Sequence, residues 1–173
     1  MITELETERL LLRPFRNEDF EPLAEMMTNE EHMKFIGGTC DRETAWRRLA
    51  TSVGHWHLRG FGFFALEEKT SGNFLGWTGL WFPQGWPEKE IGWTLLPQAC
   101  GKGFVTEAAK RVRQHAYQDL GWKTAISLIA RGNEASKKVA ERLGATFERD
   151  INLWDMDCMI YRHLSPSELK TET

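Results

Sequence analysis

A short loop with two glycines, near residue 100, joins a strand pattern to a helix pattern. Before the loop, Ile91, Trp93 and Leu95 alternate with smaller or more polar residues, which indicates a strand. After it, apolar residues recur every four positions from Phe104 to Leu120, which predicts a long amphipathic helix. Such a turn directs free backbone N–H groups and the positive end of the helix dipole toward one point. The sequence therefore predicts a phosphate-binding loop.

The two glycines do not have the spacing of the common nucleotide-binding loops. The Gly-x-x-x-x-Gly-Lys-Ser/Thr pattern of a P-loop is missing, and Thr106 stands where a dinucleotide fingerprint has its third glycine. The segment instead contains Gln-x-x-Gly-x-Gly, formed by Gln98, Gly101 and Gly103. This pattern closely resembles the pyrophosphate-binding motif of the GNAT superfamily of acyl-CoA-dependent N-acyltransferases. The alternative is an ordinary turn between a strand and a helix.

Composition narrows the class of protein. The chain has 173 residues, 41% hydrophobic and 27% charged, which suits one globular domain with its own core. Lys and Arg number 22 against 25 Asp and Glu, a net charge of -3 that argues against a nucleic-acid-binding protein. The apolar runs are too short for a membrane span, and residues 1–4 lack the start of a signal peptide, so we expect a cytoplasmic protein. Three widely spaced cysteines imply neither a disulfide framework nor a metal site.

Apolar periodicity and turn residues predict an α+β fold in the order β-α-α-β-β-β-α-β-α-β-β, with a mixed sheet of about seven strands and four helices. The expected strands cover 9–14, 61–66, 74–82, 90–95, 124–130, 145–154 and 158–164. The expected helices cover 15–27, 41–59, 104–120 and 133–143, and residues 28–39 are expected to be irregular. We assign the domain to 1–165 and a loose polar tail to 166–173. An apolar stripe on the second helix is expected to face the core: Trp46, Leu49, Ala50, Val53, Trp56 and His57.

This order of elements, with the glycine loop after the fourth strand, resembles the GNAT fold over essentially the whole chain. Three segments also resemble the branch of ribosomal-protein alanine N-acetyltransferases: 6–13, 101–108 and the Asn-x-x-Ser…Leu-Gly segment at 133–145. One departure is Ala145, where that branch often carries Phe. The resemblance implies an enzyme that moves an acetyl group from acetyl-CoA to a primary amine by direct attack in a ternary complex. The amine would be a protein N-terminal α-amine or a small-molecule amine. A monomer or homodimer without a metal is expected.

The resemblance also implies which residues bind acetyl-CoA. Backbone N–H groups of the glycine loop would wrap the pyrophosphate, and Lys102 is either a phosphate contact or a solvated loop charge. The pantetheine arm would pair with the strand before the loop, and a backbone N–H near Leu95 would face the thioester carbonyl. Asn133 would hydrogen-bond that arm while capping its own helix. The expected cofactor-binding residues are Trp93, Thr94, Leu95, Gln98, Gly101, Lys102, Gly103, Phe104, Val105 and Asn133.

Acetyl transfer to an amine needs a base, because an alkyl ammonium with a pKa of about 10.4 is almost fully protonated at neutral pH. Glu90 is the expected base, acting directly or through water, and the alternative is a solvent-facing carboxylate at a strand end. Glu88, Glu31 and His32 are rivals. Ser136 is expected to protonate the leaving thiolate, and the alternative is a residue of the capping turn.

The acceptor is less well defined by the sequence. Four tryptophans are candidates for an acceptor cleft, although core packing is the alternative for most: Trp77, Trp81, Trp86 and Trp93. Of these, Trp81 and Trp86 are the better surface candidates. Four acidic residues are compatible with a cationic acceptor: Glu30, Glu31, Asp155 and Asp157. An acyl-Cys100 route is disfavoured because Cys100 lies beside the expected phosphate site. A non-catalytic CoA-binding module on the same fold is the competing function.

Overall fold

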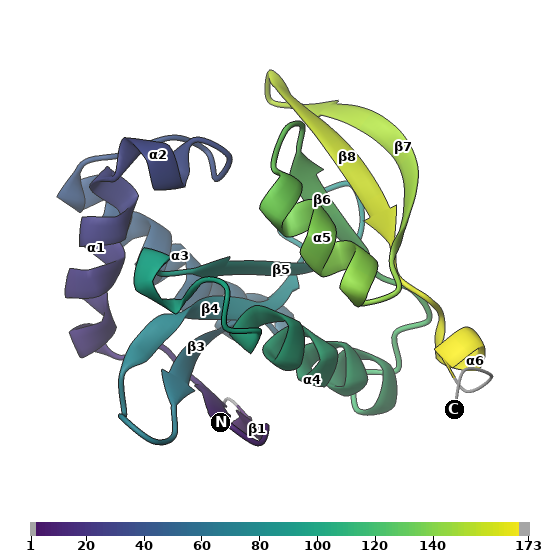
Figure 1. The fold of residues 1–173 in the computed structure, drawn as a ribbon, viewed down its shortest axis with the longest axis horizontal. Coiled ribbons are helices and arrows are strands. Elements are labelled where there is room, and N and C mark those ends of the chain that lie inside the picture. The colour runs from purple at the N-terminus through teal and green to yellow at the C-terminus, as the bar shows by residue number, and fades with distance from the viewer. Residues whose placement is uncertain (1–2, 170–173) are drawn as a thin grey trace.

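An eight-stranded mixed sheet runs through the molecule, with strand order β1-β2-β3-β4-β5-β6-β8-β7 (Figure 1). The computed structural model describes residues 3–169. The strands are β1 (Leu5–Glu6), β2 (Leu10–Arg13), β3 (Phe63–Glu68), β4 (Phe74–Trp81), β5 (Glu90–Leu95), β6 (Ile126–Ala130), β7 (Thr146–Leu153) and β8 (Met156–Arg162). The helices are α1 (Phe20–Thr28), α2 (Glu30–Met33), α3 (Arg42–Arg59), α4 (Phe104–Gln118), α5 (Glu134–Arg142) and α6 (Pro166–Leu169), with 3-10 turns at Asn17–Asp19 and Pro97–Ala99. The predicted α+β class and the succession of its main elements are confirmed.

The sheet separates where β5 meets β6. β3 and β4 form the predicted antiparallel hairpin, and β5 lies antiparallel to β4. β5 and β6 run parallel, and within residues 3–169 the two strands share a single register pair, Glu90 with Ile126. Figure 1 shows β5 and β6 diverging from each other, while α4 connects them. The edges of both strands beyond that pair are therefore left without a neighbouring strand on this side.

Small side chains allow α4 to lie close to the sheet. Ala108, Ala109, Val112 and Ala116 are completely buried, and the helix packs against β4 and β5. α1 and α3 form a second hydrophobic cluster, which includes Leu96 just after β5. Because the end of β5 is anchored in both clusters, the glycine loop starts from a fixed point in the fold.

The predicted stripe on α3 is only partly right: Leu49 and Trp56 are buried as expected, but the rest of the stripe is not. Trp46 and Val53 were expected to face the core, but they are 55% and 45% exposed. The buried face instead includes Ala45 and His55. His55 can be buried because both ring nitrogens have backbone partners, the Phe61 carbonyl at 2.8 Å and the Phe82 N–H at 3.1 Å. Hydrophobicity alone could not identify a buried histidine whose partners lie outside its own helix.

The structure adds three short elements to those predicted. β1 pairs antiparallel with β2 and makes eight strands in place of about seven. α2 is a single helical turn inside 28–39, which was expected to be irregular. α6 covers the start of the predicted loose tail, and residues 170–173 of that tail lie outside the described part of the chain. None of the helices between residues 3 and 169 combines the length and the apolar character that crossing a membrane requires.

Candidate active site

A cleft of about 1500 Å³ opens where β5 and β6 diverge. Nine of the twelve predicted site residues line it: Glu90, Trp93, Thr94, Leu95, Gly101, Gly103, Val105, Asn133 and Ser136. The other three, Gln98, Lys102 and Phe104, are not part of its lining. Phe104 is instead buried in the core at the first turn of α4. The topology thus brings together residues from β5, the glycine loop and α5 that lie up to 46 positions apart in sequence.

The glycine loop has the backbone conformation that an N-terminal anion site requires. Gly101 and Gly103 have φ angles of 77° and 81°, in the left-handed region, and Gly103 is the N-cap of α4. A Cβ at Gly101 would have no atom within 4 Å, so glycine is favoured there by conformation and not by lack of space. The first turn of α4 therefore presents its N–H groups at the end of the cleft.

Thr106 is a candidate ligand residue that the sequence analysis missed. Its hydroxyl oxygen is buried without a hydrogen-bond partner within residues 3–169, and the residue lines the cleft beside the loop. A buried hydroxyl normally has a partner. In the sequence, Thr106 occupies the place of the third glycine of a dinucleotide fingerprint, and its position in the first turn of the helix is the signal that it could contact a phosphate.

Arg9, near the N-terminus, contacts the glycine loop and the first turn of α4. Its guanidinium donates to the Lys102 carbonyl at 3.0 Å and to the Glu107 carboxylate at 2.7 Å, and it lies 4.5 Å above the Phe104 ring. The Thr7 hydroxyl donates to the same carboxylate at 2.6 Å. These contacts join two of the segments on which the family resemblance rests, 6–13 and 101–108, in the folded protein. Arg9 contacts only the backbone carbonyl of Lys102, and Lys102 itself is exposed to solvent.

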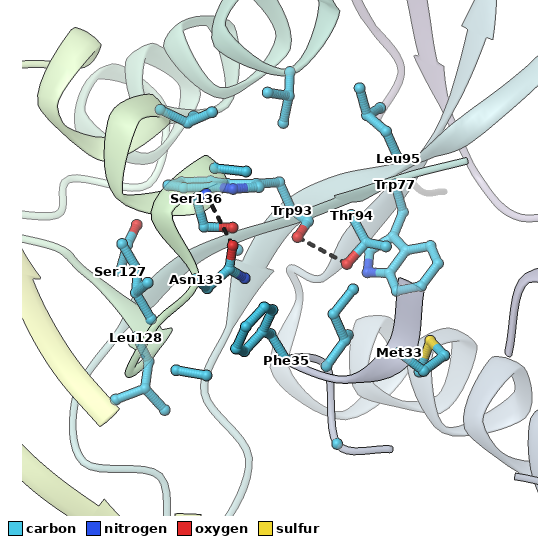
Figure 2. Close-up of a pocket in the computed structure, with 18 of the residues that line it drawn as sticks. Met33, Phe35, Trp77, Trp93, Thr94, Leu95, Ser127, Leu128, Asn133 and Ser136 are labelled. Carbon is cyan, nitrogen blue, oxygen red and sulfur yellow. Dashed lines mark hydrogen bonds between the residues drawn. The ribbon is translucent and has the colours of Figure 1, made fainter. Parts of the chain in front are cut away.

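The unpaired edge of β5 faces α5 across the cleft. Figure 2 shows Thr94 and Leu95 on one side of the cleft and Asn133 and Ser136 on the other, while the Trp93 ring extends toward α5, where it packs in the cluster that includes Ala140. The Asn133 side-chain oxygen accepts the Ser136 backbone N–H at 3.1 Å, which confirms Asn133 as the N-cap of α5. The cap uses only the oxygen of the amide, so its NH₂ group can donate to a ligand. The side chain of Ser136 lines the cleft from the same turn.

Glu90 is buried at the point where β5 and β6 separate. It is 6% exposed, which overturns the alternative of a solvent-facing carboxylate. The Trp86 indole N–H donates to one carboxylate oxygen at 2.7 Å, and the Leu128 backbone N–H donates to the other at 3.2 Å. Burial raises the pKa of Glu90 to about 7, although the two hydrogen bonds oppose this shift. A carboxyl group with this pKa can exchange a proton near neutral pH.

The rival bases have less suitable surroundings. Glu88 does not line the cleft, and Arg162 at 2.7 Å and Arg149 at 3.1 Å hold the pKa of its carboxyl below the ordinary value. His32 lines the cleft, and burial lowers its pKa. Glu31 also lines the cleft but is exposed. Of the four, Glu90 is the buried one, and burial raises its pKa to about 7.

Aromatic residues line much of the remaining surface. All four candidate tryptophans line the cleft, and so do Phe35 and Trp154, which the sequence analysis did not single out. Phe35 projects into the cleft from the segment after α2 (Figure 2), and its ring would lie 3.4 Å from a Cβ at Gly132. The Phe35 ring therefore reaches from the α2 side of the cleft to Gly132, in the loop before α5. Within residues 3–169, no group of three or more His, Cys, Asp and Glu residues is arranged to hold a metal ion.

Comparisons with known proteins show which proteins this chain is similar to. The family described as Acetyltransferase (GNAT) domain matches residues 9–146. An acetyltransferase from Agrobacterium tumefaciens str. C58 has a structure with a TM-score of 0.88 and 31% identity, over 95% of this chain and 96% of that chain. The YkkB protein of Bacillus subtilis (strain 168) is 27% identical over 94% of this chain and 96% of that protein. RimL, a ribosomal L7/L12 alpha-N-protein acetyltransferase in complex with coenzyme A, has a TM-score of 0.74 at 17% identity, over 94% of this chain and 98% of that chain, which is a likeness of fold alone.

Proposed function

Since the chain belongs to the GNAT family of acetyltransferases, we propose that it transfers an acetyl group from acetyl-CoA to a primary amine by direct attack in a ternary complex. The observation that carries this proposal is the cleft itself, which joins a helix N-terminus, an unpaired strand edge and a buried carboxyl group. The helix N-terminus suits the diphosphate of coenzyme A, the strand edge suits the amides of its pantetheine arm, and the carboxyl group suits the reacting amine. RimL, which has the same fold, binds coenzyme A.

Acetyl-CoA would enter with its diphosphate at the glycine loop. The N–H groups from Gly101 to Val105 would bind the phosphate oxygens, and the Thr106 hydroxyl would gain the partner that it lacks. Lys138 and Arg142 line the cleft and would add positive charge. The pantetheine amides would pair with the free edge of β5, because its backbone N–H and C=O groups have no strand beside them there.

Proton transfer would involve Glu90 and Ser136. Glu90 would take a proton from the ammonium, directly or through a water molecule, and the amine lone pair would attack the thioester carbon. The carbon–sulfur bond then breaks, and the leaving thiolate takes a proton from the Ser136 hydroxyl. The attacking nitrogen gives up its surplus proton, which returns through water to the serine oxygen, so both the amide and the serine end neutral. A thiol with an ordinary pKa near 8.5 needs only weak acid assistance. The product is an amide with free coenzyme A.

The acceptor is proposed to be a protein N-terminal α-amine or a small-molecule amine. Membership of the ribosomal-protein branch is a proposal that rests on the three sequence segments at 6–13, 101–108 and 133–145. The likeness to RimL supports the fold and does not select the acceptor.

The test is a screen for acetyl-CoA consumption across peptides, polyamines and small amines, with coenzyme A binding measured by calorimetry. Turnover with a primary amine supports the enzyme. Binding of coenzyme A without turnover of any amine would favour the non-catalytic module, and no binding at all would refute the assignment of the cleft.

A further inference from the structure

We propose that Trp86 and Trp154 form an aromatic wall beside Glu90, and that this wall selects a primary amine carried by a flat aromatic group through a short linker. The inference rests on the proposed function, because it assigns the substrate class of the same cleft. It concerns the part of the acceptor that does not react.

The first observation is the conformation of the hairpin tip between β7 and β8. Leu153 pairs with Met156, so Trp154 and Asp155 form a two-residue turn. Their φ angles are 49° and 64°, and they are the only non-glycine residues with positive φ in the described part of the chain. Such turns favour Asn-Gly or Asp-Gly, and a bulky side chain in the left-handed region is strained. Burial offsets little of this strain, because the Trp154 side chain is 72% exposed. An exposed tryptophan held at a strained position indicates a ligand contact.

The second observation is the connection from this tryptophan to the expected base. The Trp154 ring centroid lies 5.5 Å from that of Trp86 at an interplanar angle of 59°. The Trp86 indole N–H donates to the Glu90 carboxylate at 2.7 Å. Trp154, Trp86 and Glu90 all line the cleft. An amine held at Glu90 therefore has two indole rings close to the atoms that follow its nitrogen.

A second set of aromatic rings lies near Glu90, on the β3–β4 side. Trp81 pairs with Glu90 in the sheet register and stacks on Phe63, with ring centroids 4.7 Å apart and an interplanar angle of 13°. A Cβ at Gly92 would lie 3.2 Å from the Phe63 ring and 3.5 Å from a Glu90 oxygen. The Phe63 ring therefore already fills the space that a side chain at Gly92 would take, which places an aromatic surface close to the Glu90 carboxylate. A flat apolar group is the chemistry that such surfaces bind.

The charges of the cleft do not favour a polycation. Of the four acidic residues expected to attract a cationic acceptor, only Glu31 lines the cleft. Its acidic and its lysine and arginine lining residues are equal in number: Glu31, Glu90 and Glu134 against Arg48, Lys138 and Arg142. Because Lys138 and Arg142 are assigned to the diphosphate, a polyamine would have to rely on Glu31, the one of those four carboxylates in the lining. An extended peptide would need hydrogen-bond partners for its backbone, which aromatic walls do not supply.

The test compares 2-phenylethylamine with n-hexylamine, spermidine and a short peptide as acceptors for the full chain. We expect the lowest KM for 2-phenylethylamine. Trp154→Ala should raise this KM by about 3- to 10-fold, the amount typical of one aromatic pair, and leave the KM of acetyl-CoA unchanged. Phe147→Ala is the matched control, because Phe147 is a 52% exposed aromatic residue of the same hairpin outside the cleft lining. It should leave both KM values unchanged.

Binding measurements separate the inference from the proposed function. Calorimetry of 2-phenylethylamine added to the coenzyme A complex should show weaker binding to Trp154→Ala than to Phe147→Ala, even if no amine is acetylated. Turnover of other amines together with equal KM values for hexylamine and 2-phenylethylamine, or identical behaviour of the two variants, would overturn the aromatic wall and leave the acetyltransferase proposal standing. Aromatic amine binding without any acetylation would support the wall and refute the proposed reaction.

Discussion

Replacement of the expected base, Glu90→Gln, tests the chemistry most directly. With a pKa of about 7, the wild-type carboxyl is about nine-tenths protonated at pH 6, so kcat/KM should fall about tenfold per pH unit below 7. The glutamine has nearly the same shape but cannot accept the proton. We expect kcat/KM at pH 7 to fall by about 10²- to 10⁴-fold, the usual contribution of a positioned base.

The loss should become smaller as pH rises toward 10, because more of the amine is already neutral and needs no base. The assay is the initial rate of thiol release from acetyl-CoA between pH 5 and 10. Glu31→Gln is the matched control, since it removes another carboxylate of the cleft lining and should keep the wild-type profile. A Glu90→Gln enzyme with an unchanged pH profile would refute Glu90 as the base.

The raised pKa also predicts a stability difference that does not depend on catalysis. A carboxyl with a pKa of about 7 when folded and about 4.5 when unfolded contributes no pH dependence below 4.5, where both states are protonated. As pH rises from 4.5 through 7, the unfolded state loses its proton first, so stability decreases by about 3 kcal/mol. Glu90→Gln should lack this decrease. Parallel stability curves for the two proteins over this range would show that the carboxyl is not perturbed by burial.

Three further substitutions test the loop and the surroundings of the base. Gly103→Asp should abolish coenzyme A binding in calorimetry by placing a carboxylate at the diphosphate, whereas Gly103→Asn, with the same shape and a similar backbone cost, should retain measurable binding. Arg9→Met should raise the KM of acetyl-CoA severalfold with little change in kcat, because the loop loses its hydrogen bonds to the guanidinium; an unchanged KM would show that Arg9 does not position the loop. Trp86→Phe removes the N–H donor from the Glu90 carboxylate, so the acidic limb of the kcat/KM profile should move to higher pH; an unmoved limb would contradict the hydrogen bond's effect on that pKa.

Short-range patterns were read correctly because their physics is local. A left-handed turn needs glycine at Gly101 and Gly103, and a helix start favours a side-chain acceptor such as that of Asn133. Both features are decided by a few consecutive residues. They were sufficient, with the order of strands and helices, to predict the fold class and where the left-handed glycine loop lies along the chain.

Features that depend on distant partners were decided only by the tertiary structure. The sequence located Glu90 at a strand end, but its burial depends on Trp86, Leu128 and the point where β5 and β6 separate. The same holds for the buried His55, whose partners lie outside its own helix, and for Trp154, which meets Trp86 only because the β7–β8 hairpin reaches over the cleft. A pKa and a binding wall are properties of the surroundings of a residue, and those surroundings come from parts of the chain that no local pattern connects.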